Sequence, residues 1–268
     1  MTERLSNLKR LTQIAISLST EKSHERLLET ILLEAKDIAR ADGGTIYLRT
    51  EDDHLQFAIM RTDSLGIALG GTTGKEINLP RIPMFDGSGS PNHHNVATHA
   101  ALEGVTFNIP DAYHADGFDF SGTKKFDTHN GYRSKSFLTI PMKTKKGSCI
   151  GVLQLLNSKD ADSGEVVPFA APVAELVESL ASLAAVALEN QMLIEAQKTL
   201  LDSFIRLIAD AIDRKSPYTG GHCKRVPVIT EMLAKEACKT ADGPLAEFDL
   251  TDEDWEALHI AAWLHDCG

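Results

Sequence analysis

Two short segments near the end of the chain carry side chains that could bind a metal ion. His222 and Arg225 lie three positions apart and would share one face of a helix. His265 and Asp266 are neighbours and follow His222 by 43 residues. Adjacent residues of a helix point about 100° apart, so this pair suits two ions, or one ion where the helix ends. Imidazole and carboxylate ligands together favour zinc, iron, manganese or nickel.

Five of the seven histidines in the first half of the chain are candidate ligands, and two interpretations of each stay open. They could include a ligand of a haem or a metal ion. The simpler interpretation of each is a loop or surface side chain. These residues are His93, His94, His99, His114 and His129.

The segments around the C-terminal ligands resemble the HD-GYP branch of the HD-domain phosphohydrolases, from about residue 199 to 268. "PYTGGHCKRV" is similar to the family segment "YTxGHxxRV", and "AAWLHDCG" is similar to "LLHDxGK". The resemblance implies that His222, His265 and Asp266 bind metal, with Asp266 between two ions. It implies that Arg225 contacts substrate phosphate or forms a structural ion pair. Tyr218 stands where some members carry a glutamate, which favours two ions over three.

The same resemblance implies a phosphodiesterase that hydrolyses a cyclic dinucleotide, usually cyclic di-GMP, with two divalent ions of iron or manganese. The family's later histidines, distal aspartate and "GYP" segment do not follow within these 268 residues. We therefore expect a fragment that is inactive by itself and belongs to an active parent protein. The alternative is a non-catalytic dimeric sensory module whose degenerate HD domain binds other proteins.

The elements that precede this region predict an α+β domain with a mainly antiparallel sheet. Leucines at helical spacing predict a first helix, and Ser23 is a candidate N-cap for a second. A helix ending at Gly104 follows a loop rich in proline, glycine and asparagine. Thr251 is a candidate N-cap for the last helix. The predicted strands are "GTIYLR", "HLQFAIM", "VTFNI", "SFLTIPM" and "CIGVLQLLN".

Residues from about 23 to 190 resemble a GAF domain, a small-molecule sensor built on an antiparallel sheet. The resemblance lies in "NIPDAY", "HNGYRSKSFLTIPM" and "GVLQLLNSKD". It implies a ligand pocket whose candidate residues are Asp111, Tyr113, Phe118, Tyr132, Arg133 and Ser136. The Arg133 guanidinium offers a planar fork for a carboxylate or phosphate. Its alternative role is a structural salt bridge with Asp111, Asp116 or Asp119.

The ligand of this domain stays unknown. Members that bind cyclic nucleotides carry Asn-Lys, then Phe, then Asp-Glu. Here Ser158 follows Asn157, and the acidic pair is replaced by Val173 and Ala174 although Phe169 is present. This departure argues against cyclic-nucleotide binding. Cys149 stands at the start of a strand and is expected in the core rather than beside a covalent bilin.

A heptad pattern runs through the segment that joins the two regions. Ten of its twelve seam positions are apolar, which predicts a long helix that pairs with a second copy of the chain. The alternative is an amphipathic helix that lies on its own domain. The seam consists of Val173, Leu176, Leu180, Leu183, Ala187, Asn190, Ile194, Gln197, Leu201, Phe204, Ile208 and Ala211. The predicted organisation is an N-terminal helix (1–22), a GAF domain (23–172), a connecting helix (173–212) and a truncated all-α HD-type domain (213–268).

Composition narrows the class of protein. The net charge of −11 disfavours DNA or RNA as a partner, because phosphate binding needs clustered lysine and arginine. The N-terminus lacks a secretory signal pattern, and we expect a cytoplasmic protein without a membrane segment. Its cysteines fit no zinc pattern and are expected to be reduced thiols: Cys149, Cys223, Cys238 and Cys267.

Overall fold

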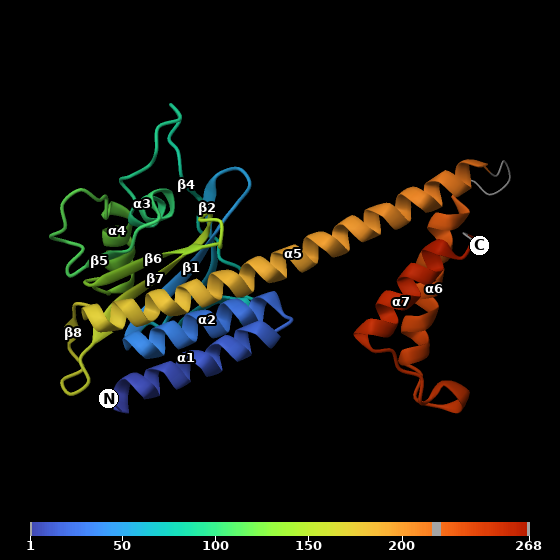
Figure 1. Ribbon diagram of the computed structural model, residues 1–268, viewed down its shortest axis with the longest axis horizontal. Coiled ribbons are helices and arrows are strands. Elements are labelled where there is room, and N and C mark those ends of the chain that lie inside the picture. Colours follow the sequence, from blue (N-terminus) through green and yellow to red (C-terminus); the bar gives the residue numbers. More distant parts are fainter. Residues whose placement is uncertain (1, 216–220, 267–268) are drawn as a thin grey trace. The chain divides into compact units, whose positions relative to one another are not determined.

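The computed structural model describes the chain over residues 2–215 and 221–266. The chain divides into a first unit, Met1–Met192, and a second unit, Leu193–Gly268. One helix, α5 (Ala171–Lys215), contributes residues to both units (Figure 1). The division between these units lies inside this helix, most of which was predicted as a separate connecting segment, 173–212.

The first unit is built on the antiparallel sheet that the sequence predicts. Its strands follow the order β3-β2-β1-β7-β6-β5, with β4 beside β2 and β8 beside β7. All of these pairs are antiparallel. The strands are β1 (Ala41–Arg49), β2 (His54–Thr62), β3 (Ile67–Gly70), β4 (Ile82–Pro83), β5 (Phe107–Ile109), β6 (Phe137–Lys143), β7 (Cys149–Lys159) and β8 (Val166–Val167).

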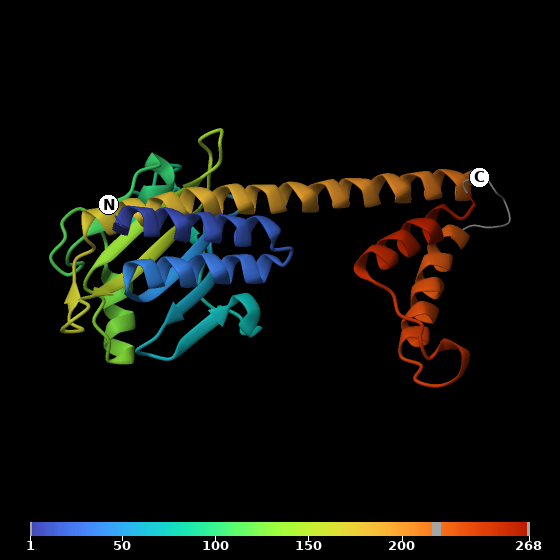
Figure 2. The ribbon, with the colours of Figure 1, turned by 60° about the horizontal axis from the view of Figure 1, so that its bottom comes forward.

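Helices α1 (Thr2–Thr20), α2 (His24–Ala39) and the first half of α5 cover one face of the sheet (Figure 2). Ser23 caps α2 by accepting a hydrogen bond from the backbone N–H of Arg26, as predicted. Leu32 of α2 and Leu155 of β7 are both fully buried in the resulting core. A Cβ at Gly44 would lie 2.7 Å from the side-chain end of Leu32, so a larger residue here would force the leucines between helix and sheet to shift.

The opposite face of the sheet is covered by α3 (Val96–Glu103), α4 (Ser121–Asn130) and long connections. The short helix η1 (Gly71–Thr73) follows β3, and Thr72 forms a hydrogen bond with Glu29 of α2. Asn95 caps the start of α3, and Gly104 ends it in the left-handed conformation, as predicted. Cys149 is buried in the core on this face, also as predicted. Helix α4 was missed, because "SGTKKFDTHN" lacks an apolar helical stripe.

The first half of α5 is part of the first unit's core. Val177, Leu180 and Leu188 are fully buried within the unit, so this side of the helix is covered by its own domain. From Met192 onward most apolar side chains are exposed, among them Ile194, Leu201, Phe204 and Ile208. Among the predicted seam positions of the first half, Leu180 is buried, whereas Val173, Leu176, Leu183 and Ala187 are half-buried. Pairing of the helix with a second copy stays a prediction.

Among the described residues, the segment Ala171–Asp213 is long and apolar enough to span a membrane by length and composition. Its first half is the core helix just described, and such a helix meets the same criterion. Burial in the core of the first unit therefore explains why the first half of this segment is apolar.

The second unit contains the end of α5, α6 (His222–Cys238), η2 (Gly243–Leu245) and α7 (Asp252–Leu264). Ile205 and Ala209 of α5 pack with Cys223 and Trp263 in a small buried cluster. Thr251 and Asp254 form a reciprocal capping box at the start of α7, which confirms the predicted N-cap.

Candidate functional site

The second unit brings the three predicted metal ligands together. The Nε2 atoms of His222 and His265 lie 3.1 Å apart. The Oδ2 atom of Asp266 lies 3.2 Å from Nε2 of His265 and 3.7 Å from Nε2 of His222. Ligand atoms around a tetrahedral ion with bonds of about 2.0–2.2 Å are roughly 3.3 Å apart. The three residues therefore fit one divalent transition-metal ion.

A backbone hydrogen bond sets the orientation of one ligand. Nδ1 of His265 lies 2.9 Å from the carbonyl oxygen of Ala262 and can donate its proton there. This bond leaves the lone pair of His265 on Nε2, the atom that faces His222 and Asp266. Metal-binding histidines are commonly oriented in this way by a second acceptor.

Packing between helices places the ligands. His222 is the first residue of α6, and His265 is the C-cap of α7. The contact of Cys223 with Trp263 fixes the start of α6 near the end of α7. The predicted motif residues 216–220 and 267–268 lie outside the described residues.

Two further groups border this cluster. Asp213, on the last turns of α5, accepts a hydrogen bond from the backbone N–H of Cys223, and its Oδ2 has no partner among the described residues. Burial would raise the pKa of Asp213, but hydrogen bonds from Cys223 and the nearby His222 lower it overall. Arg225 is exposed in the first turn of α6. Sequence reasoning missed Asp213, because it belongs to neither motif.

A second polar group ties the three helices of this unit together. Nδ1 of His259 lies 3.0 Å from Glu231 of α6, and its Nε2 lies 2.9 Å from Asp202 of α5. The hydrogen bond to Glu231 raises the pKa of His259, and Asp202 adds to this effect, although burial opposes it. No sequence motif marked this residue, because its two partners come from other helices.

The first unit contains a cavity of about 330 Å³ between the sheet and the α3–α4 face. This volume lies within the range of small-molecule sites. Tyr47 donates a hydrogen bond to Gln154, which in turn donates to Thr139. Burial raises the pKa of Tyr47, so its phenol stays protonated. The cavity lining comprises Thr45, Tyr47, Phe57, Met60, Thr62, Leu79, Pro80, Ile82, Asn95, Val96, Asp119, Phe120, Gly122, Thr123, Phe126, Ser134, Phe137, Gln154 and Leu156.

None of the six predicted pocket residues lines this cavity. Arg133 forms a salt bridge with Asp111 at 3.1 Å, the structural alternative considered for it. Its guanidinium carbon also lies 3.4 Å from the centre of the Tyr113 ring. Phe118 packs against Phe107 and Phe120. The cavity is therefore formed by a different set of residues from the predicted one.

The remaining predicted pocket residues join the hydrogen-bond network around Asn157. The Asn157 side chain accepts from the backbone N–H of Lys135 at 2.7 Å and donates to Tyr132 and to the carbonyl of Arg133. The Ser136 hydroxyl donates to the carbonyl of Val167. Asn157 thus holds the segment before β6, a structural role that its place in the GAF segment "LQLLN" does not reveal.

The Tyr132 hydroxyl reaches a buried carboxylate, Asp42, at 2.7 Å. Ser64 and Lys159 also contact Asp42. Burial would raise the pKa of Asp42, but the hydrogen bonds from these three side chains lower it. Members that bind cyclic nucleotides carry a lysine directly after the asparagine, whereas here Ser158 stands there and Lys159 follows it. In this structure Lys159 pairs with the buried carboxylate of Asp42.

Comparisons with known proteins identify the first unit. A family model described as "GAF domain" matches residues 23–188. The dual 3',5'-cyclic-AMP and -GMP phosphodiesterase 11 of Drosophila melanogaster is 37% identical over 67 residues, which make up 25% of this chain and 4% of that protein. The dual 3',5'-cyclic-AMP and -GMP phosphodiesterase 11A of Takifugu rubripes is 31% identical over 104 residues, or 39% of this chain and 11% of that protein. The chain therefore spans only a small part of these relatives.

A solved structure shows the same fold. The GAF domain from a phosphoenolpyruvate-protein phosphotransferase of Coxiella burnetii superposes with a TM-score of 0.53 and 15% sequence identity. The match covers 72% of this chain and 98% of that domain. Because the family match covers more than half of the residues, this chain belongs to the GAF domain family.

Proposed function

We propose that the protein is a GAF sensor that controls a metal-dependent phosphodiesterase of the HD-GYP type, with a cyclic dinucleotide such as cyclic di-GMP as substrate. The observation that carries this proposal is the convergence of His222, His265 and Asp266 from two helices. Two segments separated by 43 residues supply one compact set of ligand atoms. The "YTGGHCKRV" and "LHDCG" motifs give this set its proposed chemistry.

The proposed metal is a divalent transition-metal ion, iron or manganese. His222, His265 and Asp266 would supply the ligands for these ions, the two histidines through Nε2. When bound, such ions lower the pKa of a coordinated water and shield the charge on the phosphodiester. Arg225 binds a substrate phosphate, for which its exposed guanidinium is suited. A second ion needs ligands beyond these three, so the activity is proposed for the natural protein at its full length.

The two matched relatives are named as phosphodiesterases, and this name is the support that they give to a role in phosphodiester signalling. Both are called dual cyclic-AMP and cyclic-GMP phosphodiesterases, and the chain covers 4% and 11% of them. The substrate class proposed here therefore depends on the HD-type motifs.

For the GAF unit we propose a small uncharged ligand in the cavity beside Tyr47 and Gln154. Among the described lining residues there is no lysine, arginine or histidine, and Asp119 is the single charged side chain. An anionic ligand would lack a counter-charge in this cavity, at a high cost in free energy. Apolar side chains with a few hydrogen-bonding groups suit a neutral molecule.

The partner proposed for the connecting helix is a second copy of the chain. The support is the run of exposed apolar residues on α5, among which Ile194, Leu201 and Phe204 continue the heptad. Such a seam would join two copies through the helix that links sensor and effector. The proposed localisation is the cytoplasm, as expected for a sensor with reduced thiols.

The experiment is a hydrolysis assay of the full-length natural protein with cyclic di-GMP and Mn²⁺ or Fe²⁺. We expect turnover that His265→Ala or Asp266→Asn lowers by at least about a thousandfold, since each removes a metal ligand. The matched control is His114→Gln, a substitution at an exposed histidine of the first unit. Full-length protein that is loaded with metal and does not hydrolyse cyclic dinucleotides would contradict the proposal.

A further inference from the structure

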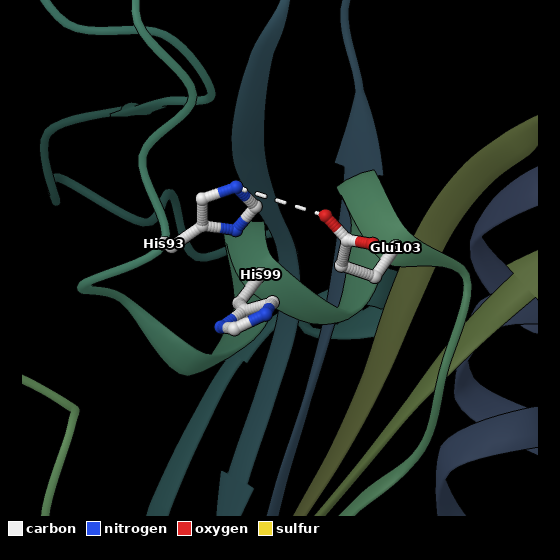
Figure 3. A group of neighbouring side chains, drawn as sticks. All are labelled: His93, His99 and Glu103. Atoms are coloured by element: carbon white, nitrogen blue, oxygen red, sulfur yellow. Dashed lines mark ion pairs between the residues drawn. The ribbon is translucent and has the colours of Figure 1, made fainter.

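We infer that the first unit carries its own site for a divalent transition-metal ion, formed by His93, His99 and Glu103 (Figure 3). This inference does not depend on the ligands of the second unit or on phosphodiesterase activity. It assigns a specific role to two of the five histidines that the sequence left open.

One helix and the loop before it supply the three side chains. His99 and Glu103 lie four residues apart on α3, so they share one face of that helix. His93 belongs to the loop that leads into α3 and lies above His99 in Figure 3. A short segment of eleven residues therefore carries all three ligands.

The loop that carries His93 is held in place on both sides. The backbone N–H of Asn92 donates to the carbonyl of Met84, and the Asn92 side chain donates to the carbonyl of Pro83. From the helix, the Thr98 hydroxyl donates to the carbonyl of Asn92 at 2.6 Å. Because these bonds fix the loop against α3, His93 is positioned near His99 before any ligand binds.

The geometry of the side chains suits a shared ion. One ligand atom from each of the three residues lies within 4.8 Å of the other two. Nε2 of His93 lies 3.6 Å from Oε1 of Glu103, and the rings of His93 and His99 have centroids 4.4 Å apart. Tetrahedral coordination needs spacings of roughly 3.3 Å. Glu103 is about half exposed, so its side chain has room to move toward the two rings.

Two buried nitrogen atoms in the cluster have no partner. Nδ1 of His93 and Nδ1 of His99 are both shielded from solvent and make no hydrogen bond within the part of the chain that the structure describes. Buried polar groups are nearly always paired, and an exception calls for an explanation. An ion coordinated by one of these Nδ1 atoms would pair it directly, because a neutral imidazole nitrogen donates its lone pair to metal.

The surroundings favour tight binding without closing the site. His99 packs against Phe107 and Phe118, with ring centroids 4.8 Å and 5.6 Å away. These rings keep water from one side of the cluster, and the exposed Glu103 leaves the other side open. Two imidazoles and one carboxylate with an open position form the donor set of zinc and similar ions, rather than of calcium or magnesium.

The position of the site links it to the ligand cavity. Asn95 and Val96 line the cavity, and they lie between His93 and His99 in the sequence. The backbone N–H of Asp119, another lining residue, donates to the carbonyl of His94. An ion that joins His93 to α3 would therefore stiffen one wall of the cavity.

The test is a zinc titration by calorimetry of the chelator-stripped full chain carrying His265→Ala, which removes a ligand of the second-unit cluster. We expect one ion per chain with a dissociation constant below about 10 µM. Adding His93→Gln together with Glu103→Gln removes two ligands while keeping side-chain size, and should weaken binding by at least tenfold. Adding His114→Gln instead should leave zinc affinity unchanged, because His114 pairs with Asp111 outside the cluster.

Cobalt gives a second measurement that does not depend on affinity alone. Co²⁺ bound by two imidazoles and a carboxylate should show visible absorption in the His265→Ala chain, and the double glutamine variant should lose it. Circular dichroism in the presence of chelator checks that this variant is folded. Equal zinc binding by the folded variant and its parent, or no zinc binding by the parent at 100 µM, would overturn the inference and leave the cluster as packed rings.

Discussion

Both halves of α5 are rich in apolar residues, but these residues lie in different environments. In the first half Val177, Leu180 and Leu188 are fully buried against the sheet and α2. In the second half Leu200, Phe204 and Leu207 are more than half exposed. A heptad pattern thus marks an apolar stripe, and the fold decides whether that stripe is covered by its own domain or left for a partner.

A charge in the first half should have the largest effect. Leu180→Glu places a carboxylate in the core of the first unit, where nothing compensates it, and should lower the free energy of unfolding by more than about 4 kcal/mol. Urea denaturation followed by circular dichroism measures this loss. Ser182→Glu adds the same charge at an exposed position of the same turns and should change stability by less than about 0.5 kcal/mol.

A charge in the second half should break association and leave the fold intact. Leu201→Glu with Phe204→Glu puts charges into the proposed seam, so the double variant should be monomeric at tens of micromolar by light scattering. Its circular dichroism should match that of the wild type. Ser203→Glu, at an exposed position off the seam, is the matched control. A monomeric wild type under the same conditions would remove the proposed dimer.

The two units also differ in their polar groups. Loss of the buried Asn157 in the first unit should lower stability more than loss of His259 in the second. Asn157 has φ of 55° and forms hydrogen bonds with the backbone of Lys135 and Arg133 and with the Tyr132 hydroxyl. Asn157→Ala should cost about 2–4 kcal/mol of unfolding free energy. Asn157→Gly should cost about 1 kcal/mol less, because glycine adopts positive φ without strain. Equal losses would show that the backbone conformation contributes nothing.

In the second unit, His259 should contribute the smallest amount of stability of these groups, and this amount should depend on pH. Glu231 and Asp202 raise its pKa in the folded state above 6.5. The stability that protonated His259 adds to the folded state is therefore complete below about pH 6.5. It is lost as the pH rises through the folded-state pKa of His259. We expect the second unit to lose up to about 1 kcal/mol of stability between pH 6 and pH 8.5.

Tryptophan fluorescence measures this change in the second unit alone. Both tryptophans of the chain, Trp255 and Trp263, lie in α7. His259→Gln keeps hydrogen-bonding capacity and removes the titrating ring, so the slope of stability against pH should flatten. Chelator in the buffer keeps metal binding out of the measurement. An unchanged slope would show that other groups cause the pH dependence.

The parts of the fold that local chemistry decides could be predicted from the sequence. Ser23, Gly104 and Thr251 end or begin helices because their own side chains or dihedral freedom satisfy helix termini. The long strands could be predicted because their segments are rich in apolar and β-branched residues. Helix α4 was missed because the sequence lacks an apolar stripe there. The helix is held instead by the buried Phe120 at its N-terminus and by the buried Asp127, which accepts hydrogen bonds from Tyr113 and Ser134.

The candidate sites also differ in how far the sequence predicted them. Motifs pointed to His222, His265 and Asp266, because each segment carries its own ligand residues. The cavity was assigned to other residues, since its lining comes from strands and helices far apart in the chain. Arg133 shows the limit most clearly: its residue type suits an anionic ligand, but in the fold Asp111 and Tyr113 occupy it. Only tertiary structure distinguishes these two roles.

The central claim is that the second unit holds metal through the ligands that α6 and α7 bring together. Elemental analysis of the full-length protein purified without added metal tests it most directly, with His265→Ala, Asp266→Asn and His114→Gln beside the wild type. We expect His265→Ala and Asp266→Asn each to lose at least one equivalent of iron or manganese, and His114→Gln to retain the wild-type content. Equal metal content in wild type, His265→Ala and Asp266→Asn would contradict it.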